Sequence, residues 1–154
     1  MRTYNRFDLA VGNTVMRVAG PLHAWVYDRS RGRIGKTLLG APVGNLVNVG
    51  AKSGRVRHTP LLMLSDEDNI VIVASKGGWP EHPGWYHNLK ANPDCEVVMG
   101  GQTRSMTARL ADDAERDRLW PMLDDMYRYY RAYRRRAALA DRVIPVFVLE
   151  PRAA

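Results

Sequence analysis

The sequence predicts a mainly β protein of the α+β class, an antiparallel barrel or curled sheet of about six strands with helices attached. Three observations support this. Short apolar runs rich in Val, Ile and Thr recur after residue 36 and are typical of strands. The compact polar turn at 66–69 joins two of them as in a β-hairpin. The helical segments interrupt the strands without alternating with them, so a doubly wound parallel sheet is not expected.

The expected strands follow one another from residue 45 to residue 150. They are NLVNVG at 45–50, RHTPLLMLS at 57–65, NIVIVAS at 69–75, CEVVMGG at 95–101, TRSMTARLA at 103–111 and IPVFVLE at 144–150. A short helix follows the third strand and a long helix follows the fifth, an order that favours antiparallel pairing.

The short helix is expected near residues 83–91. It carries Trp85, Tyr86 and Leu89 within one or two turns, and the pair Asn92-Pro93 ends it. The apolar side chains predict that one face of this helix packs against the sheet.

The long helix is expected near residues 112–138. The carboxylates of Asp112 and Asp113 suit a helix N-terminus, where they oppose the helix dipole. Pro121 predicts a kink inside it, because proline lacks the backbone N–H and clashes with the preceding turn.

Residues 1–36 are expected to form an N-terminal helix and a basic arm, and residues 37–154 the barrel, within one domain overall. The run at 14–27 has helical apolar spacing that Gly20-Pro21 interrupts, and a glycine-punctuated basic loop follows. This arm either packs on the barrel or on a partner subunit, or rests peripherally on an anionic membrane.

Composition limits the function classes. The chain has 154 residues, 45% of them hydrophobic, which suits one ordinary core. Cys95 is the single cysteine, and no N-terminal run is apolar enough for a signal peptide or a membrane span, so a cytoplasmic protein is expected. The net charge of +7 attracts anions, whether nucleic acid, anionic lipid or a phosphorylated small molecule. The four histidines form no i, i+4 pair, so no metal site is expected.

The sequence VGAKSG at 49–54 is not a P-loop, because Ala51 separates Gly50 from the lysine and a strand-like run follows. What remains is a glycine-bounded turn whose backbone N–H groups are available to an anion. Its polar side chains are Lys52, Ser53, Arg55 and Arg57. A solvated basic turn is the alternative interpretation.

The segment VIVASKGG at 71–78 begins as a buried strand and breaks at Gly77-Gly78. Ser75 and Lys76 lack the spacing of a serine nucleophile with a lysine base. Without side chains at the glycines, a flat ligand could lie against the main chain and take hydrogen bonds from it. A tight turn without a ligand remains the alternative.

The expected long helix carries tyrosines interleaved with arginines. The tyrosines are Tyr127, Tyr129, Tyr130 and Tyr133. Tyrosines at such helical spacing usually pack in the core, and the arginines between them usually face solvent. Four hydroxyl groups in one short window are more than packing requires, so they could also roof a pocket and donate a proton. Nucleic-acid binding suits the composition, but no recognisable nucleic-acid-binding motif is present.

Four motifs together resemble the deazaflavin-dependent nitroreductase family of actinobacterial reductases, over about residues 40–151. They are GAKSG with TPL, IVIVASKGG with PGWYHNLKANP, TARLADDAERDRLWPMLDDMYRYYRAY, and RVIPVFVLEP. Members have a split β-barrel related to the flavin-mononucleotide-binding barrels. They use reduced coenzyme F-420, a deazaflavin with a phospholactyl-oligoglutamate tail, to reduce quinones and, promiscuously, nitroaromatic compounds and activated alkenes.

The resemblance implies roles for individual residues. Cofactor binding would fall to Lys52, Ser53, Gly54, Arg55, Arg57, Pro60, Ala74, Ser75, Lys76, Gly77, Trp85, Tyr86 and Asn88. Within this set the turn at 52–54 would hold the cofactor phosphate, and the backbone of 74–77 would line the deazaflavin ring. Catalysis would fall to Tyr127, Tyr130 and Tyr133, with Ser75 as their polar companion. Many relatives have an arginine where this chain has Ala51, which would shift phosphate binding toward Arg55 and Arg57.

The resemblance therefore implies hydride transfer from coenzyme F-420 to a quinone, a nitroaromatic compound or an enone. Flavin mononucleotide is the alternative cofactor, and an anion- or nucleic-acid-binding module without turnover is the alternative function. No nucleic-acid partner is expected, and a homodimer is left open.

Overall fold

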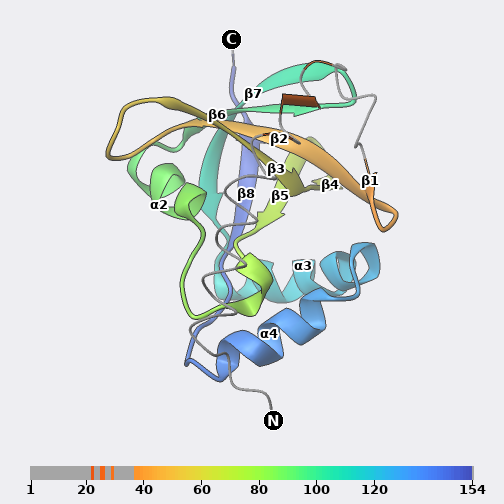
Figure 1. The fold of residues 1–154 in the computed structure, drawn as a ribbon. Helices are drawn as coiled ribbons and strands as arrows, with labels where there is room; N and C mark the ends of the chain where they lie inside the picture. Colours follow the sequence, from red (N-terminus) through yellow and green to blue (C-terminus); the bar gives the residue numbers. More distant parts are fainter. Residues whose placement is uncertain (1–21, 23–24, 27–28, 30–36, 154) are drawn as a thin grey trace.

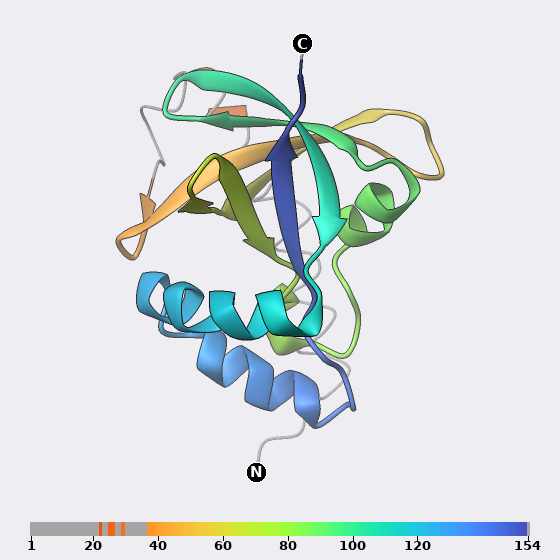
Figure 2. The same cartoon turned by 180° about the vertical axis from the view of Figure 1, so that it is seen from behind.

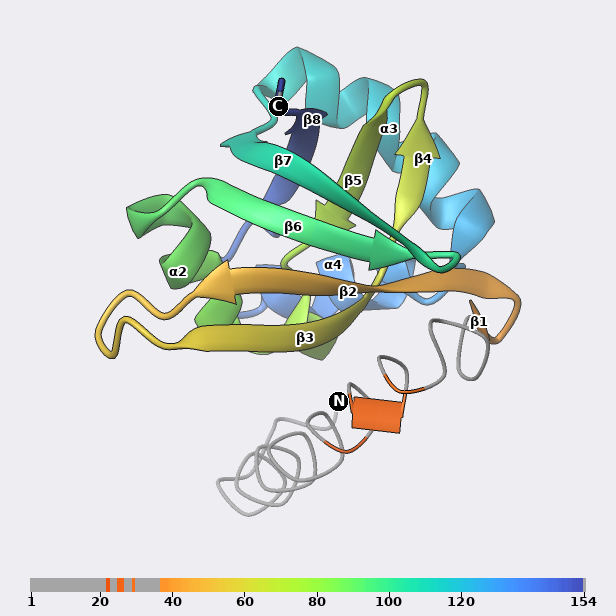
Figure 3. The ribbon, with the colours of Figure 1, turned by 90° about the horizontal axis from the view of Figure 1, so that it is seen from above.

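The computed structural model describes residues 22, 25–26, 29 and 37–153, and in this part of the chain all strands join one antiparallel sheet. The strand path is β1–β2–β6–β7–β8–β5–β4, and β3 pairs with β2 outside this path (Figure 1). The strands are β1 (Thr37–Leu38), β2 (Ala41–Val49), β3 (Val56–Leu62), β4 (Leu64–Asp66), β5 (Asn69–Val73), β6 (Asp94–Met99), β7 (Gln102–Leu110) and β8 (Val146–Pro151). Seen from above, they curl around a common interior (Figure 3).

The helices lie at the ends and on the outside of the curled sheet. They are α2 (Gly84–Ala91), α3 (Asp113–Met126) and α4 (Tyr130–Ala138), with a single 3-10 turn, η1, at Lys76–Gly78. Figure 2 shows α3 and α4 stacked one below the other across the open end of the sheet. The mainly β class, the short helix and the hairpin at 66–69, where Asp66 pairs with Asn69, are confirmed.

Alternation along β5 and β8 builds two cores, because successive side chains of a strand point to opposite faces. Ile70, Ile72, Phe147 and Leu149 face the barrel interior, where Trp85 and Leu89 of α2 join them. The intervening residues of the same two strands face α3 and α4. They are Val71, Val73, Val146 and Val148. These strands are therefore buried on both faces, which explains their continuous apolar sequence.

The single long helix expected at 112–138 is wrong. Asp112 does cap the start, where its side chain accepts a hydrogen bond from Glu115 N at 2.8 Å. The helix continues through Pro121 and ends at Met126, because the backbone of the next residue, Tyr127, is extended at φ −147° and ψ 92°. The interruption lets the apolar faces of α3 and α4 both reach the same core, whereas one straight rod of this length would carry its second half away from the sheet.

Eight strands are present in the described part where about six were expected. One addition is the two-residue β1. The other arises because the run 57–65 divides into β3 and β4 at the fully buried Met63, whose N–H donates to Pro42 O at 3.0 Å. The expected N-terminal helix and arm at 1–36 lie outside the described residues, apart from four positions. Among the described helices, none is long and apolar enough to span a bilayer.

Candidate active site

An open cavity of about 500 Å³ lies between the 50–55 turn, which joins β2 to β3, and the start of α2. Its lining residues are Gly50, Ala51, Lys52, Ser53, Arg57, Gly84, His87 and Asn88. Lys52 and Arg57 bring two positive charges. The first turn of α2, which begins at Gly84, adds the partial positive charge of a helix N-terminus. The cavity therefore favours an anion.

The 50–55 turn is held in one shape by local hydrogen bonds. Gly50 N donates to Arg55 O and Gly54 N donates to Gly50 O, both at 2.8 Å. Gly54 has φ +66°, a left-handed conformation that favours glycine. Ala51 N donates to Asn88 Oδ1 at 2.9 Å, which fixes the turn against α2. The N–H groups of Lys52 and Ser53 donate to no described residue and remain available to a ligand.

The 74–79 loop follows β5 and contains three consecutive left-handed residues. Lys76, Gly77 and Gly78 have φ values of 46°, 64° and 76°. Lys76 Nζ pairs with Glu81 Oε2 at 2.9 Å and lies 5.5 Å from the centre of the Trp79 ring. The hydrogen bond from Lys76 holds the pKa of the Glu81 carboxyl below its ordinary value. The loop therefore keeps its lysine beside an exposed carboxylate.

Arginines from α4 and from the chain after it bind the carbonyl groups of the 74–79 loop. Arg136 Nη1 donates to Gly77 O at 3.0 Å. Arg142 Nη1 donates to Ser75 O at 3.0 Å and to Trp79 O at 2.6 Å, and its Nη2 donates to Ala74 O. The carbonyl side of this loop is thus bound by the protein itself.

The tyrosine cluster consists of Tyr127, Tyr130 and Tyr133, whose ring centres lie 5.1 to 6.2 Å apart. The hydroxyl oxygens of Tyr127 and Tyr133 lie 3.2 Å apart, within hydrogen-bonding distance. Burial raises the pKa of Tyr130 and Tyr133, and for Tyr133 the hydrogen bond with Tyr127 raises it further. These hydroxyl groups therefore stay protonated at neutral pH. The exposed Tyr129 ring also contacts Tyr127, at 5.2 Å between ring centres, but its hydroxyl group accepts a hydrogen bond from Arg128 Nη2 at 3.3 Å.

A buried carboxylate fixes α4, which carries two of these tyrosines, against α3. Asp124 is 8% exposed and accepts hydrogen bonds from Arg134 at 2.8 and 2.7 Å and from Arg131 at 3.1 Å. The guanidinium of Arg134 also lies 4.0 Å from the centre of the Trp120 ring. Burial opposes the charge of Asp124, but the two arginines outweigh it and keep its pKa below the ordinary value.

The sequence profile of the family described as F420H(2)-dependent quinone reductase matches residues 20–151. The chain belongs to this family. The resemblance that the motifs suggested is confirmed.

Individual relatives agree with the family profile. An F420H(2)-dependent quinone reductase of Mycobacterium tuberculosis is 42% identical over 135 residues, which cover 85% of this chain and 89% of that protein. A solved structure of an F420-H2 dependent reductase is 39% identical, with a TM-score of 0.65 over 71% of this chain and 94% of the other. Another solved structure, described as a domain-swapped dimer, is 36% identical with a TM-score of 0.65 over 82% of this chain and 97% of the other.

A distant likeness shows the fold alone. A Listeria innocua structure described provisionally as a pyridoxamine 5′-phosphate oxidase is 14% identical, with a TM-score of 0.50 over 72% of this chain and 84% of the other. The curled antiparallel sheet of this F420H(2)-dependent quinone reductase family member is thus a split barrel.

The residues predicted from the sequence fall into three places in this member of the quinone reductase family. Four of the predicted cofactor-binding residues line the cavity: Lys52, Ser53, Arg57 and Asn88. Gly54 and Arg55 belong to the same turn, but they are not among the lining residues. Ala74, Ser75, Lys76 and Gly77 form the 74–79 loop, which packs against α4 near the tyrosine cluster.

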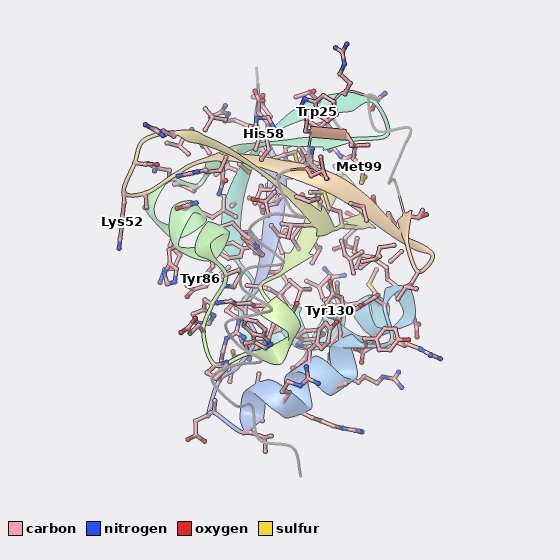
Figure 4. All side chains as sticks on the ribbon, in the orientation of Figure 1. Trp25, Lys52, His58, Tyr86, Met99 and Tyr130 are labelled. Atoms are coloured by element: carbon pink, nitrogen blue, oxygen red, sulfur yellow. The ribbon has the colours of Figure 1, made fainter. Side chains whose placement is uncertain are left out.

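Three further predicted residues, Trp85, Pro60 and Tyr86, are not among the lining residues of the cavity. Trp85 is 7% exposed and packs in the barrel core, 5.9 Å from Phe147 between ring centres. Pro60 lies within β3, where it pairs with Asn45 of β2. Tyr86 is half-buried, and its ring stacks on His82 at 4.1 Å. Figure 4 places Tyr86 between Lys52 on one side and Tyr130 on the other.

Sequence reasoning missed His87 and Arg142. His87 follows Gly84 by three residues, so the start of the short helix could have suggested that both face one side. No local pattern marks Arg142, because its partners lie sixty or more residues away in the sequence. No group of three or more potential metal ligands occurs among the described residues.

Proposed function

We propose that this chain reduces quinones with reduced coenzyme F-420 as the hydride donor. The observation that carries the proposal is the family match over residues 20–151. Three parts of the structure support this activity. The cation-lined cavity suits the cofactor tail, the 74–79 loop suits the cofactor ring, and the tyrosine cluster suits the acceptor.

The cavity suits the cofactor's polyanionic tail. Lys52 and Arg57 supply charge, and the N–H groups of Lys52 and Ser53 supply donors that make no bond to a described residue. A phosphate accepts from such donors at several oxygens at once. Ala51 contributes only its backbone, which donates to Asn88, so Arg57 is the arginine on which phosphate binding depends most.

The 74–79 loop suits the edge of a flat ring. The N–H groups of Ser75 and Lys76 donate to no described residue, and neither does the Ser75 hydroxyl. These donors match the carbonyl oxygens of a deazaflavin. When bound, the reduced deazaflavin supplies a hydride, which is chemistry that protein side chains lack.

The tyrosine cluster suits the acceptor side. A quinone that accepts a hydride gains negative charge on one oxygen, and that oxygen then needs a proton. Tyr133 and Tyr127 form a hydroxyl pair at 3.2 Å, so one can donate to the acceptor while the other supports it. Because the pKa of Tyr133 is raised, its proton is present at neutral pH, and solvent replaces it after turnover.

Nitroaromatic compounds and activated alkenes are proposed as further acceptors, because they also accept a hydride and then a proton. Self-association is proposed from the similar chain described as a domain-swapped dimer. The cytoplasmic location, the membrane contact of the arm and the domain boundary at residue 36 stay predictions.

The test is titration with coenzyme F-420 followed by its fluorescence, and then turnover of the reduced form with menadione followed by absorbance. We expect saturable binding and oxidation that requires both protein and menadione. Thermal stabilisation by flavin mononucleotide and none by coenzyme F-420 would assign the barrel to the alternative cofactor. Binding without oxidation across a panel of quinones, nitroaromatics and enones would leave only a carrier role.

A further inference from the structure

Arg142 is a buried arginine without a carboxylate partner among the described residues. It is 8% exposed, and no salt bridge of the described part includes it. Its guanidinium donates to the carbonyl oxygens of Ala74, Ser75 and Trp79, and its Nε donates to His82 Nδ1 at 3.1 Å. Burial lowers the pKa of Arg142, yet arginine remains charged in proteins. A buried charge that neutral groups hold costs free energy, so a positional role is expected.

The end of α4 places this side chain. Asp141 is left-handed at φ +51°, Asp141 N donates to Ala138 O at 3.1 Å, and Arg142 N donates to Ala137 O at 3.1 Å. These two bonds form a Schellman motif, which ends a helix and reverses the chain. The reversal turns Arg142 back toward the 74–79 loop, which already touches α4 at Gly78.

The carbonyl bonds determine where two N–H groups of the loop point. In a planar trans peptide the C=O and the following N–H point in opposite directions. Because Ala74 O and Ser75 O are directed to Arg142, the N–H groups of Ser75 and Lys76 are directed away from it. The N–H groups of Ser75 and Lys76 donate to no described residue.

We propose that Arg142 is a positioning residue that aims the backbone N–H groups of Ser75 and Lys76 at the cofactor ring. The inference rests on the proposed function, because it takes the 74–79 loop as the ring site. Arg142 touches neither cofactor nor acceptor and acts through the loop.

The shape of the guanidinium matters here. Its planar fork reaches three carbonyl oxygens and one imidazole nitrogen from fixed directions. A lysine has one nitrogen and cannot span the same set. Alanine would leave the carbonyl oxygens without these donors, and the peptide planes could then rotate.

The experiment compares Arg142→Ala and Arg142→Lys with the full-length wild type. The matched control is Arg109→Lys, which replaces an arginine whose three side-chain hydrogen bonds go to Glu115 and Glu150 and not to the loop. We measure the affinity for coenzyme F-420, the shift of its absorption maximum on binding, and kcat and KM with menadione. Circular dichroism and the melting temperature confirm that each variant is folded.

For both Arg142 variants we expect kcat to fall about a hundredfold, because a misplacement near 1 Å costs about that much. The absorption maximum of bound cofactor should move toward that of free cofactor. The affinity for coenzyme F-420 should change less than kcat, because Lys52 and Arg57, which are proposed to bind the cofactor tail, are untouched. Methylguanidinium added to Arg142→Ala should restore part of the rate, and Arg109→Lys should behave as wild type.

Folded Arg142 variants with wild-type kcat and absorption shift would overturn the inference. So would a rate loss without any change in the absorption shift. If Arg142→Ala does not fold, Arg142→Lys decides by the same two measurements. Failure of the proposed function is distinguishable, because the wild type itself would then neither bind coenzyme F-420 nor oxidise its reduced form.

Discussion

A Cβ atom at Gly78 would lie 2.3 Å from the carbonyl oxygen of Tyr133 and 2.9 Å from its Cα. Glycine at this position therefore lets the 74–79 loop touch the backbone of α4, the helix that carries Tyr133. The missing side chain serves packing between two parts of the candidate site, and no ligand is needed to explain it.

Gly78→Ala should destabilise the protein by about 3 kcal/mol or more, because a left-handed alanine and a clash with a rigid backbone add together. Gly77→Ala is the control. Among the described residues, a Cβ there would meet only the Trp79 ring, at 3.8 Å and beyond, so the expected loss is the cost of the left-handed backbone, about 1–2 kcal/mol. Urea unfolding of both variants measures the difference. Equal losses would contradict contact with α4 as the reason for Gly78.

Arg57→Gln should weaken coenzyme F-420 binding, and the effect should shrink at high salt because charge attraction is screened. Arg57 lines the cavity and lies 3.4 Å from the Ser53 hydroxyl. We expect a roughly tenfold loss at low salt. Arg55→Gln removes the same charge from the same turn but outside the cavity lining, so a smaller effect is expected. Fluorescence titration at two salt concentrations separates the two, and equal losses would mean that net charge alone matters.

Tyr133→Phe should lower the rate of quinone reduction by about a hundredfold and leave cofactor affinity near wild type. The change removes the hydroxyl that lies 3.2 Å from that of Tyr127. Tyr130→Phe tests the second tyrosine in the same way. Tyr129→Phe is the control, because the Tyr129 hydroxyl accepts from Arg128 and takes no part in the hydroxyl pair of Tyr127 and Tyr133. Single-turnover oxidation of the reduced cofactor measures the chemical step, and an unchanged rate in both cluster variants would remove the proton-donor role.

Asp124→Asn should lower the free energy of unfolding by about 1–3 kcal/mol at neutral pH, because Arg131 and Arg134 lose a charged acceptor. The folded pKa of Asp124 lies below its ordinary value, so its contribution is fully present above about pH 4 and is lost as pH falls through the folded pKa. The difference between wild type and variant should therefore shrink in acid. The control is Asp125→Asn, which changes an exposed neighbour that makes none of these hydrogen bonds.

Local sequence patterns predicted the strands and helix ends that depend on neighbouring residues alone. Short apolar runs rich in Val and Ile predicted β5 and β8, and the pair Asn92-Pro93 marked the end of α2. The break at Tyr127 escaped prediction, because MYRYYRAY is compatible with a continuous helix and only packing of both helices on one core divides it.

The candidate site also has one part that the local sequence predicted and one part that it did not. The 50–55 turn could be predicted, because glycines flank cationic side chains in this part of the sequence. Arg142 could not, because a lone arginine before VIP gives no sign that it will bind carbonyl groups near residue 75. Such a role depends on two segments that meet only in the folded chain.

Lys52 lies at the edge of the molecule and Tyr130 is buried in its interior, and Tyr86 lies between them in the view of Figure 4. One hairpin turn carries the first and a helix at the opposite end of the sequence carries the second, so mutations can alter either without disturbing the other. Acceptor preference could therefore diverge among descendants of this chain while the shared electron carrier stayed the same, and an engineer could randomise the aromatic end alone in search of new substrates.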